Sequence, residues 1–110
     1  MILFPPAKVN LGLKVLYKRS DGYHEIDTCM VPVPLCDVLE IVPSDTFQFV
    51  QSGLTVESGD ENNLCVKAFR LLKKTVDFPN VYIHLRKQIP MGAGLGGGSA
   101  DAAYVLKGIN

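Results

Sequence analysis

The residues most suited to chemistry lie in a glycine-rich segment from Pro90 to Ser99. Five glycines fall within residues 92–98, and glycine lets the backbone adopt positive φ angles and approach a ligand closely. Successive N–H groups can then converge on phosphate oxygens. A helix expected from Ser99 to Lys107 would add its unpaired N–H groups and positive dipole end. The segment therefore predicts a phosphate-binding loop, with Ser99 as a helix cap or as a phosphate or metal contact.

Three other interpretations of the segment compete with this one. Gly92, Gly94 and Gly97 match the dinucleotide-binding fingerprint, but that fold needs an acidic residue about 20 positions further on, and 13 residues follow Gly97. A Walker A loop needs Gly-Lys before Ser or Thr, which this sequence lacks. A loop without a ligand would still bear the glycine entropy cost, about 0.5–1 kcal/mol per residue relative to alanine. Phosphate binding is the interpretation that gives this cost a purpose.

One acidic residue follows the loop closely. Asp101 falls in the first turn of the expected helix, where it favours the helix dipole but would repel a phosphate. We expect it to point away from the ligand or towards a metal.

Apolar periodicity predicts the elements that position this loop. Alternation over Val9–Tyr17 predicts a strand with one buried face, then a turn at Asp21–Gly22 and an extended run from Glu25 to about Pro32. Further short strands are expected at Val38–Val42, Phe47–Gln51, Leu54–Glu57 and Val81–Leu85, with turns at 43–45 and 52–53.

A helix is expected between the last two of these strands. Asp60 or Asn62 would cap it, and Phe78–Asn80 would end it. Its apolar stripe is predicted to consist of Leu64, Ala68, Leu71, Leu72 and Val76. These elements together predict an α+β domain, in which helices pack on a mostly antiparallel sheet.

Composition excludes several classes of function. Eleven basic and eleven acidic residues cancel, which argues against a nucleic-acid or anionic-membrane partner. No apolar run approaches the roughly 20 residues of a membrane span, and the N-terminus lacks the basic start of a signal peptide. Cys29, Cys36 and Cys65 form no CxxC pair, so we expect no metal site but buried, reduced thiols in a cytoplasmic protein.

Four segments, in order, resemble motifs of the GHMP family of small-molecule kinases. Pro90–Ser99 is similar to the family's phosphate loop, and Pro6–Leu11 to its Pro-Ala-Lys-hydrophobic-Asn opening. Asp21–Glu25 and Glu61–Leu64 resemble segments of a family member that acts on a cytidyl diphosphate sugar-alcohol. The resemblance covers nearly the whole chain and implies the family's N-terminal fold, which is like domain 2 of a ribosomal protein.

The resemblance also implies a reaction and a set of site residues. The γ-phosphate of ATP, with Mg²⁺, would pass to the 2-hydroxyl of the cytidyl substrate in isoprenoid biosynthesis (methylerythritol phosphate pathway). Lys8 would be catalytic, because an ammonium can neutralise charge on the migrating phosphoryl group. Asn10, Tyr23 and His24 would bind the substrate, the last two by stacking on the cytosine and hydrogen-bonding its edge. The residues that would contact ATP are Asn63, Lys87, Pro90, Met91, Gly92, Ala93, Gly94, Leu95, Gly96, Gly97, Gly98, Ser99 and Ala100.

Two departures from the family pattern bear on activity. Ala100 stands where the family usually has a second serine. The family's catalytic aspartate and second domain lie further along than Asn110, so residues 1–110 are interpreted as a truncated N-terminal, ATP-binding domain. The expected last helix is also short, which favours truncation. Without that aspartate no general base is available, so we expect the chain alone to be inactive, and free to self-associate through a bare apolar face.

Other functions remain open at this point. The chain could belong to another GHMP kinase with a different acceptor, or be a non-catalytic nucleotide-binding module that acts through a partner. An RNA-binding relative is disfavoured, because the net charge is zero and there is no basic stripe.

Overall fold

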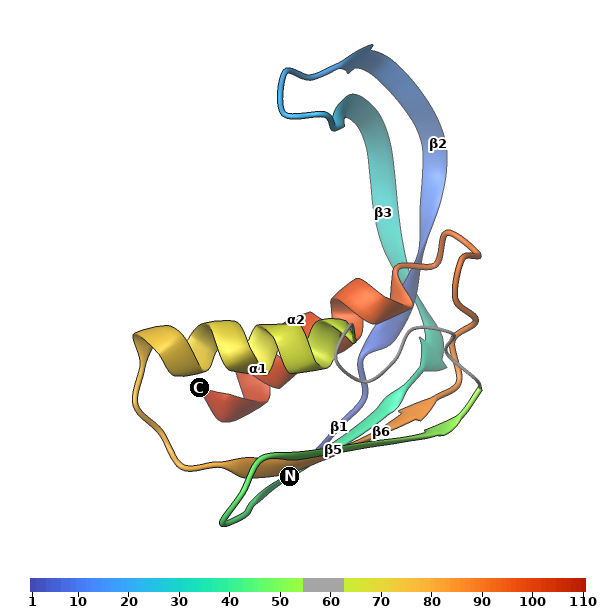
Figure 1. The fold of residues 1–110 in the computed structure, drawn as a ribbon. Coiled ribbons are helices and arrows are strands. Elements are labelled where there is room, and N and C mark those ends of the chain that lie inside the picture. The colour runs from blue at the N-terminus through green and yellow to red at the C-terminus, as the bar shows by residue number, and fades with distance from the viewer. Residues whose placement is uncertain (55–62) are drawn as a thin grey trace.

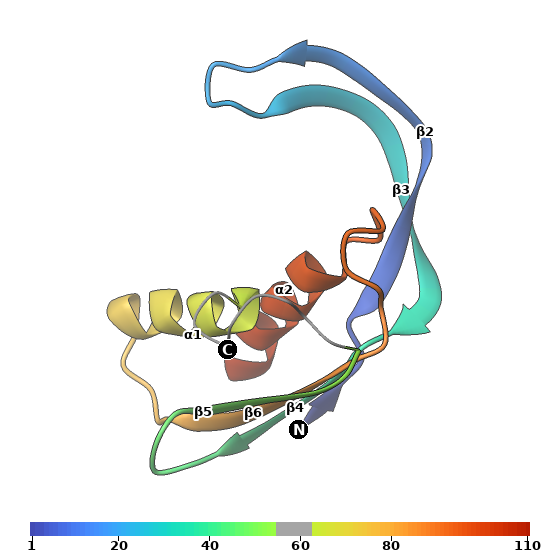
Figure 2. The same cartoon turned by 45° about the vertical axis from the view of Figure 1, so that its right-hand side comes forward.

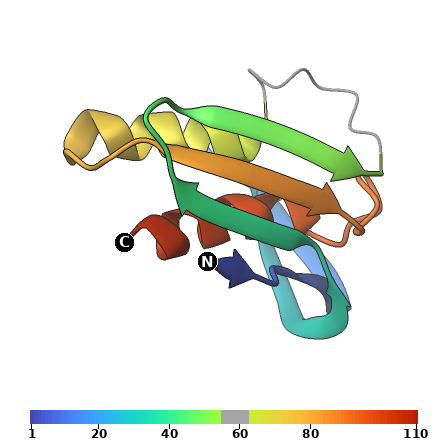
Figure 3. The same cartoon turned by 90° about the horizontal axis from the view of Figure 1, so that it is seen from below.

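The computed structural model describes residues 1–54 and 63–110. The elements in chain order are β1 (Ile2–Leu3), β2 (Pro6–Lys18), β3 (His24–Cys36), β4 (Val38–Pro43), β5 (Gln48–Gly53), α1 (Leu64–Thr75), β6 (Val81–Lys87) and α2 (Gly97–Ile109). They form a four-stranded sheet in the order β1-β4-β6-β5 and a separate two-stranded sheet of β2 and β3. Both helices lie on one face of the larger sheet (Figures 1 and 3). The predicted α+β class is confirmed.

The core lies between the larger sheet and the two helices. On β6, Val81, Ile83 and Leu85 are buried, and the residues between them are not, which confirms the predicted alternation. Leu39 and Ile41 of β4 pack beside them, and the helices contribute Cys65, Phe69 and Val105. All pairings in this sheet are antiparallel except that of β5 with β6, which is parallel. That pair is joined through α1, the type of crossover that parallel strands need.

Helix α1 is rotated relative to the predicted stripe. Leu64, Leu71 and Val76 are exposed, whereas the buried residues are Cys65, Val66, Ala68 and Phe69. The stripe prediction is therefore wrong except at Ala68 and at the half-buried Leu72. Burial of an aromatic ring explains the rotation, because a ring buries more surface than leucine and favours aromatic neighbours. The Phe69 ring stacks on Phe47 with centroids 3.9 Å apart and meets the edge of Phe78 at 5.6 Å.

Several predicted boundaries also differ from those observed. Helix α1 is capped by Asn63, while the predicted caps Asp60 and Asn62 lie outside the described residues, as does most of the predicted strand Leu54–Glu57. The turn expected at 52–53 is instead the end of β5. Gly53 adopts a φ of 83°, and a Cβ there would lie 2.3 Å from the Lys87 carbonyl oxygen. Glycine therefore lets β5 run close against β6 to its last residue.

Strands β2 and β3 form a long hairpin, here called the arm, that extends away from the larger sheet and bends (Figures 1 and 2). The register of the arm shifts between Leu11 and Lys14, where Gly12 has a φ of 66°, and an irregularity of this kind bends a strand. The strand prediction is correct, but the predicted buried face is wrong over the outer arm. Apolar side chains there are 49–60% exposed, namely Leu11, Leu13, Val15, Leu16 and Tyr17.

The three cysteines differ in burial. The prediction of buried thiols holds for Cys65, but Cys29 is exposed and Cys36 is half-buried, because both lie on the arm. Burial raises the pKa of the Cys65 thiol to about 12, so this thiol is unreactive.

Within the described ranges, no helix has the length and apolar character needed to cross a membrane.

Candidate functional site

The glycine-rich loop adopts the backbone conformation that its composition predicts. Gly92, Gly94 and Gly96 have φ angles of 73°, 72° and 67°, which residues with a Cβ rarely adopt. Gly96 is also the N-cap of α2, and no side chain in the described part of the chain caps the helix. Because the N–H groups of a first helical turn have no partner within the helix, they are available to an anion here.

Helix α2 begins two residues before the predicted start. Ser99 is therefore the third helical residue and not the cap, and the helix spans 13 residues, so the expectation of a short last helix is wrong. The helix can begin earlier because Gly96, as its N-cap, adopts a left-handed conformation that glycine tolerates. Ser99 remains exposed beside the loop.

Lys8 lies against this loop, at the base of the arm. Its Nζ donates to the carbonyl oxygen of Gly94 at 3.0 Å and to Oδ1 of Asn10 at 2.7 Å. Its backbone N–H donates to the Leu95 carbonyl at 2.8 Å. A Cβ on Gly96 would lie 3.0 Å from the Lys8 Cε. Glycine at 96 thus allows the lysine to approach, and the structure brings together the predicted catalytic residue, Asn10 and the loop.

A cleft of about 490 Å³ opens between the base of the arm and the start of α2. It is lined by Pro6, Ala7, Lys8, Met30, Pro32, Gly96, Ser99, Ala100 and Tyr104. The cleft thereby combines the lysine with three residues predicted to contact ATP. Among its described lining residues there is no carboxylate.

Tyr23 and His24 lie at the outer end of the arm, away from the loop. Tyr23 is 74% exposed, and its N–H donates to Oδ1 of Asp21 at 3.0 Å, which fixes the turn. His24 begins β3, paired with Lys18. The structure does not bring these two residues into contact with Lys8. The arm, which arches above α2 in Figure 2, separates them from it.

Two of the residues predicted to contact ATP use their side chains within the protein. Asn63 caps α1 through Oδ1, which accepts from the Cys65 N–H at 2.8 Å, and its Nδ2 donates to Gln51 at 3.2 Å. The Lys87 side chain is 2% exposed and forms ion pairs with Asp37 at 2.6 Å and Asp101 at 2.9 Å. Lys87 could therefore contact a nucleotide only through its backbone atoms.

This buried group of Lys87, Asp37 and Asp101 includes one residue that the sequence analysis missed. Asp37 is fully buried, and its Oδ1 accepts the N–H groups of Gln88 and Ile89 at 2.6 and 2.9 Å. Asp101 pairs with Lys87 in this group and is not among the residues that line the cleft. No cluster of three or more His, Cys, Asp or Glu side chains suited to a metal occurs in the described part of the chain.

The electrostatics of this group follow from burial and hydrogen bonding. Burial raises the pKa of Asp101 to about 8, and the hydrogen bond with Asp37 acts in the same direction. For Asp37, hydrogen bonds from Asp101, Lys87 and the two N–H groups outweigh burial and lower the pKa. For Lys87, burial is outweighed by the bonds to both carboxyl groups, which raise the pKa. Near neutral pH the three groups therefore carry no net charge.

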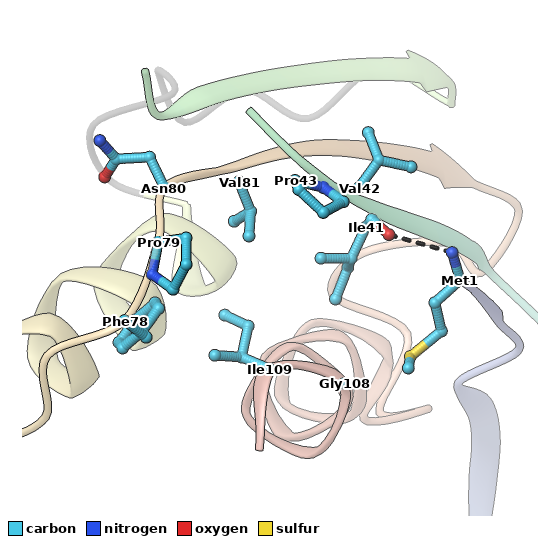
Figure 4. Close-up of a pocket in the computed structure, with 10 residues that line it drawn as sticks. All are labelled: Met1, Ile41, Val42, Pro43, Phe78, Pro79, Asn80, Val81, Gly108 and Ile109. Carbon is cyan, nitrogen blue, oxygen red and sulfur yellow. Dashed lines mark hydrogen bonds between the residues drawn. The ribbon is translucent and has the colours of Figure 1, made fainter. Parts of the chain in front are cut away.

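A second pocket, of about 320 Å³, lies at the C-terminal end of α2, opposite the loop (Figure 4). Apolar side chains such as Ile41, Phe78 and Ile109 line it, and the N-terminal ammonium beside it donates to the Ile41 carbonyl at 3.0 Å. None of the described residues that line it has a charged side chain. The cleft beside the loop is the candidate site.

The chain resembles known kinases in sequence and in fold. Residues 63–110 match the family model described as GHMP kinases N terminal domain. The chain is 56% identical over 106 residues to 4-diphosphocytidyl-2-C-methyl-D-erythritol kinase of Azobacteroides pseudotrichonymphae, covering 96% of this chain and 40% of that protein. The relative of the same name from Parabacteroides distasonis is 56% identical over 110 residues, which is 100% of this chain and 41% of that protein. The chain thus spans about two fifths of the length of these relatives.

Two solved structures share the fold. A crystal structure of 4-(cytidine 5'-diphospho)-2C-methyl-D-erythritol kinase matches with a TM-score of 0.80 and 42% identity, over 98% of this chain and 39% of that one. Streptococcus pneumoniae phosphomevalonate kinase matches with a TM-score of 0.64 and 12% identity, over 98% of this chain and 35% of that one, and shows the fold alone. The chain therefore has the N-terminal fold of the GHMP kinases, the family whose model its residues 63–110 match.

Proposed function

We propose that this chain supplies the ATP-binding part of a kinase that phosphorylates the 2-hydroxyl of 4-diphosphocytidyl-2-C-methyl-D-erythritol. One observation carries the proposal: the Lys8 ammonium and the positive-φ glycine loop meet at the mouth of one cleft. Relatives that bear this kinase's name and are 56% identical over nearly the whole chain support the choice of substrate.

The loop is suited to hold the phosphates of ATP. Free N–H groups from 92 to 99 would surround the triphosphate, and the start of α2 would add its dipole. ATP would bring Mg²⁺, which binds phosphate oxygens and water and draws few ligands from the protein. The exposed hydroxyl of Ser99 is the side-chain group of the cleft best placed to contact either of them.

Lys8 would stabilise the transferring phosphoryl group. Its ammonium bonds to the Gly94 carbonyl and to Asn10, so phosphate oxygens would replace the carbonyl while Asn10 keeps the ammonium oriented. A preorganised positive charge at this point is worth more than a mobile one, since little reorganisation occurs during the reaction.

The arm would bind the cytidyl end of the substrate. Tyr23 exposes its ring in a fixed turn, and stacking of an aromatic ring on a base is worth roughly 1–3 kcal/mol. His24, next to it, has ring nitrogens that could hydrogen-bond the base edge. The length of the arm suits an acceptor whose base and reacting hydroxyl are separated by a diphosphate.

Removal of the hydroxyl proton requires a group that this cleft does not supply. No carboxylate is among the described residues that line it, and a general base must lie within hydrogen-bond reach of the proton. We therefore propose that the base comes from outside the described residues. The 110-residue chain alone should turn over far below about 1 s⁻¹, the low end for kinases.

Product analysis on a protein of full family length that contains this chain tests the proposal. With ATP and Mg²⁺, the cytidyl substrate should yield a 2-phosphate, and Lys8→Met should lower kcat roughly 100-fold or more with a smaller change in the KM for ATP. Lys14→Met is a matched control on the same strand, further out along the arm. Phosphorylation of mevalonate or homoserine in preference to the cytidyl substrate would reassign the acceptor, and unchanged kcat in Lys8→Met would refute the role of Lys8.

A further inference from the structure

We propose that Asp37, Lys87 and Asp101 form a positioning cluster that sets the distance between the two ends of the glycine loop. The cluster would hold the N–H groups of the loop in a spacing that fits a triphosphate. It rests on the proposed function only for the identity of the anion. None of the three residues lines the cleft, so each would act through the loop backbone.

The N-terminal end of the loop is held by Asp37. Its Oδ1 accepts the N–H groups of Gln88 and Ile89, and its Oδ2 accepts from the Lys87 ammonium. The Asp37 N–H in turn donates to the Pro5 carbonyl at 3.0 Å. Because Pro5 directly precedes the strand that carries Lys8, Asp37 connects the start of the loop, through its carboxylate, to the base of the arm, through its backbone N–H.

The C-terminal end of the loop is held by Asp101. This residue lies one turn into α2, and its Oδ2 accepts from the same Lys87 ammonium at 2.9 Å. The start of the helix packs closely on the cluster. A Cβ on Gly97 would lie 2.8 Å from the Ile89 side chain and 3.2 Å from the Lys87 Nζ. A single buried ammonium therefore joins both ends of the loop.

Stability alone is a poor explanation for such a cluster. Replacement of a buried ion pair by apolar residues is often neutral or stabilising. The cluster also carries no net charge near neutral pH, so it would not repel an anion bound above it. Positioning accounts for both its location and its balance of charge.

The test compares three variants of the 110-residue chain. Asp101→Leu removes the connection to α2, and Asp101→Asn keeps an acceptor for Lys87. Val105→Ala, in the core one turn further along α2, weakens the fold without touching the cluster. Should Asp101→Leu fail to fold, Asp101→Ala removes the same carboxyl without added bulk.

The first readout is amide hydrogen exchange in the ligand-free chain. The amides of Lys8 and Ala100 report the position of the loop end, because they donate to Leu95 and Gly96. In Asp101→Leu both should exchange roughly tenfold faster relative to the core amide of Ile83, the factor expected for one lost hydrogen bond to a charged group. Asp101→Asn should restore most of the protection, and Val105→Ala should speed exchange at Ile83 and at the two reporters alike.

The second readout is affinity for ATP and for adenosine by calorimetry. Asp101→Leu should weaken ATP binding roughly tenfold and leave any adenosine binding within twofold. Equal acceleration at Ile83 and the reporters in Asp101→Leu, or an unchanged ATP affinity beside a folded variant, overturns the inference. If the exchange result is as expected but the unaltered chain binds no triphosphate, the positioning cluster stands and the proposed function fails.

Discussion

Asp101→Asn should change the pH dependence of folding stability in a defined direction. In the folded chain burial raises the pKa of Asp101 to about 8, from an ordinary value of 3.8. Between these two pH values the folded chain holds a proton that the unfolded chain has released. Stability therefore falls as pH rises through this range, because the folded state binds more protons. Asparagine imitates the protonated carboxyl and carries no such dependence.

The size of the effect follows from proton linkage. One proton of difference corresponds to about 1.4 kcal/mol per pH unit. Both pH 5 and pH 7 lie inside the range set by 3.8 and about 8. Between them, the free energy of unfolding of the variant should rise by roughly 2–3 kcal/mol relative to that of the unaltered chain. Asp37 and Lys87 are present in both proteins, so their own titrations largely cancel in the comparison.

Urea denaturation at pH 5, 6 and 7, followed by circular dichroism, measures this difference. Asp77→Asn is a suitable control, because the Asp77 side chain is fully exposed and its 4.0 Å ion pair with Lys73 belongs to a class of pair that contributes little to stability. The control should track the unaltered chain at every pH. A constant offset between Asp101→Asn and the unaltered chain would mean that Asp101 is ionised beside Lys87, and the electrostatic account of the cluster would be wrong.

Three further substitutions test separate parts of the structure. Phe69→Ala should destabilise the fold by about 3–5 kcal/mol, since the ring is buried between two other aromatic rings; thermal melting checks this, and a loss below 1 kcal/mol would show that the ring is not central to the core. Gly96→Ala should lower stability by about 1–2 kcal/mol and weaken ATP binding, because a φ of 67° is strained for alanine and the new Cβ would approach Lys8. Unchanged ATP affinity by calorimetry would contradict the observed loop geometry. Tyr23→Ala, in a protein of full family length, should raise the KM for the cytidyl substrate about 10-fold, in line with the loss of one stacked base, and leave the KM for ATP unchanged. Equal rises in both would mean that Tyr23 supports the fold instead.

Local patterns in the sequence predict those parts of the structure that depend on neighbouring residues. The glycines at 92, 94 and 96 identify the loop, since few other residues adopt positive φ. Strand β6 is recognisable because one of its faces is covered by helices, so that apolar and polar residues alternate. The parallel pairing of β5 and β6 also has a signal in the sequence, because a strand, a helix and a strand in succession favour a parallel crossover.

Other features depend on contacts that no local pattern records. Lys87 and Asp37 are separated by 50 residues, and nothing near either one indicates the pairing. Alternation over β2 predicts a strand, but it cannot say whether another layer covers the apolar face. Two faces of α1 carry apolar residues. The face with Phe69 is buried because this ring packs against Phe47 and Phe78, which lie outside the helix.

We propose above that the glycine loop binds a polyphosphate through backbone N–H groups. Titration of the isotopically labelled chain with ATP, followed by amide NMR, tests this most directly, with adenosine as the control ligand. ATP at millimolar concentration should shift the amides of residues 92–101 and that of Lys8, and adenosine should leave them in place. Unperturbed loop amides with ATP, in a chain whose spectrum shows it to be folded, would contradict the account.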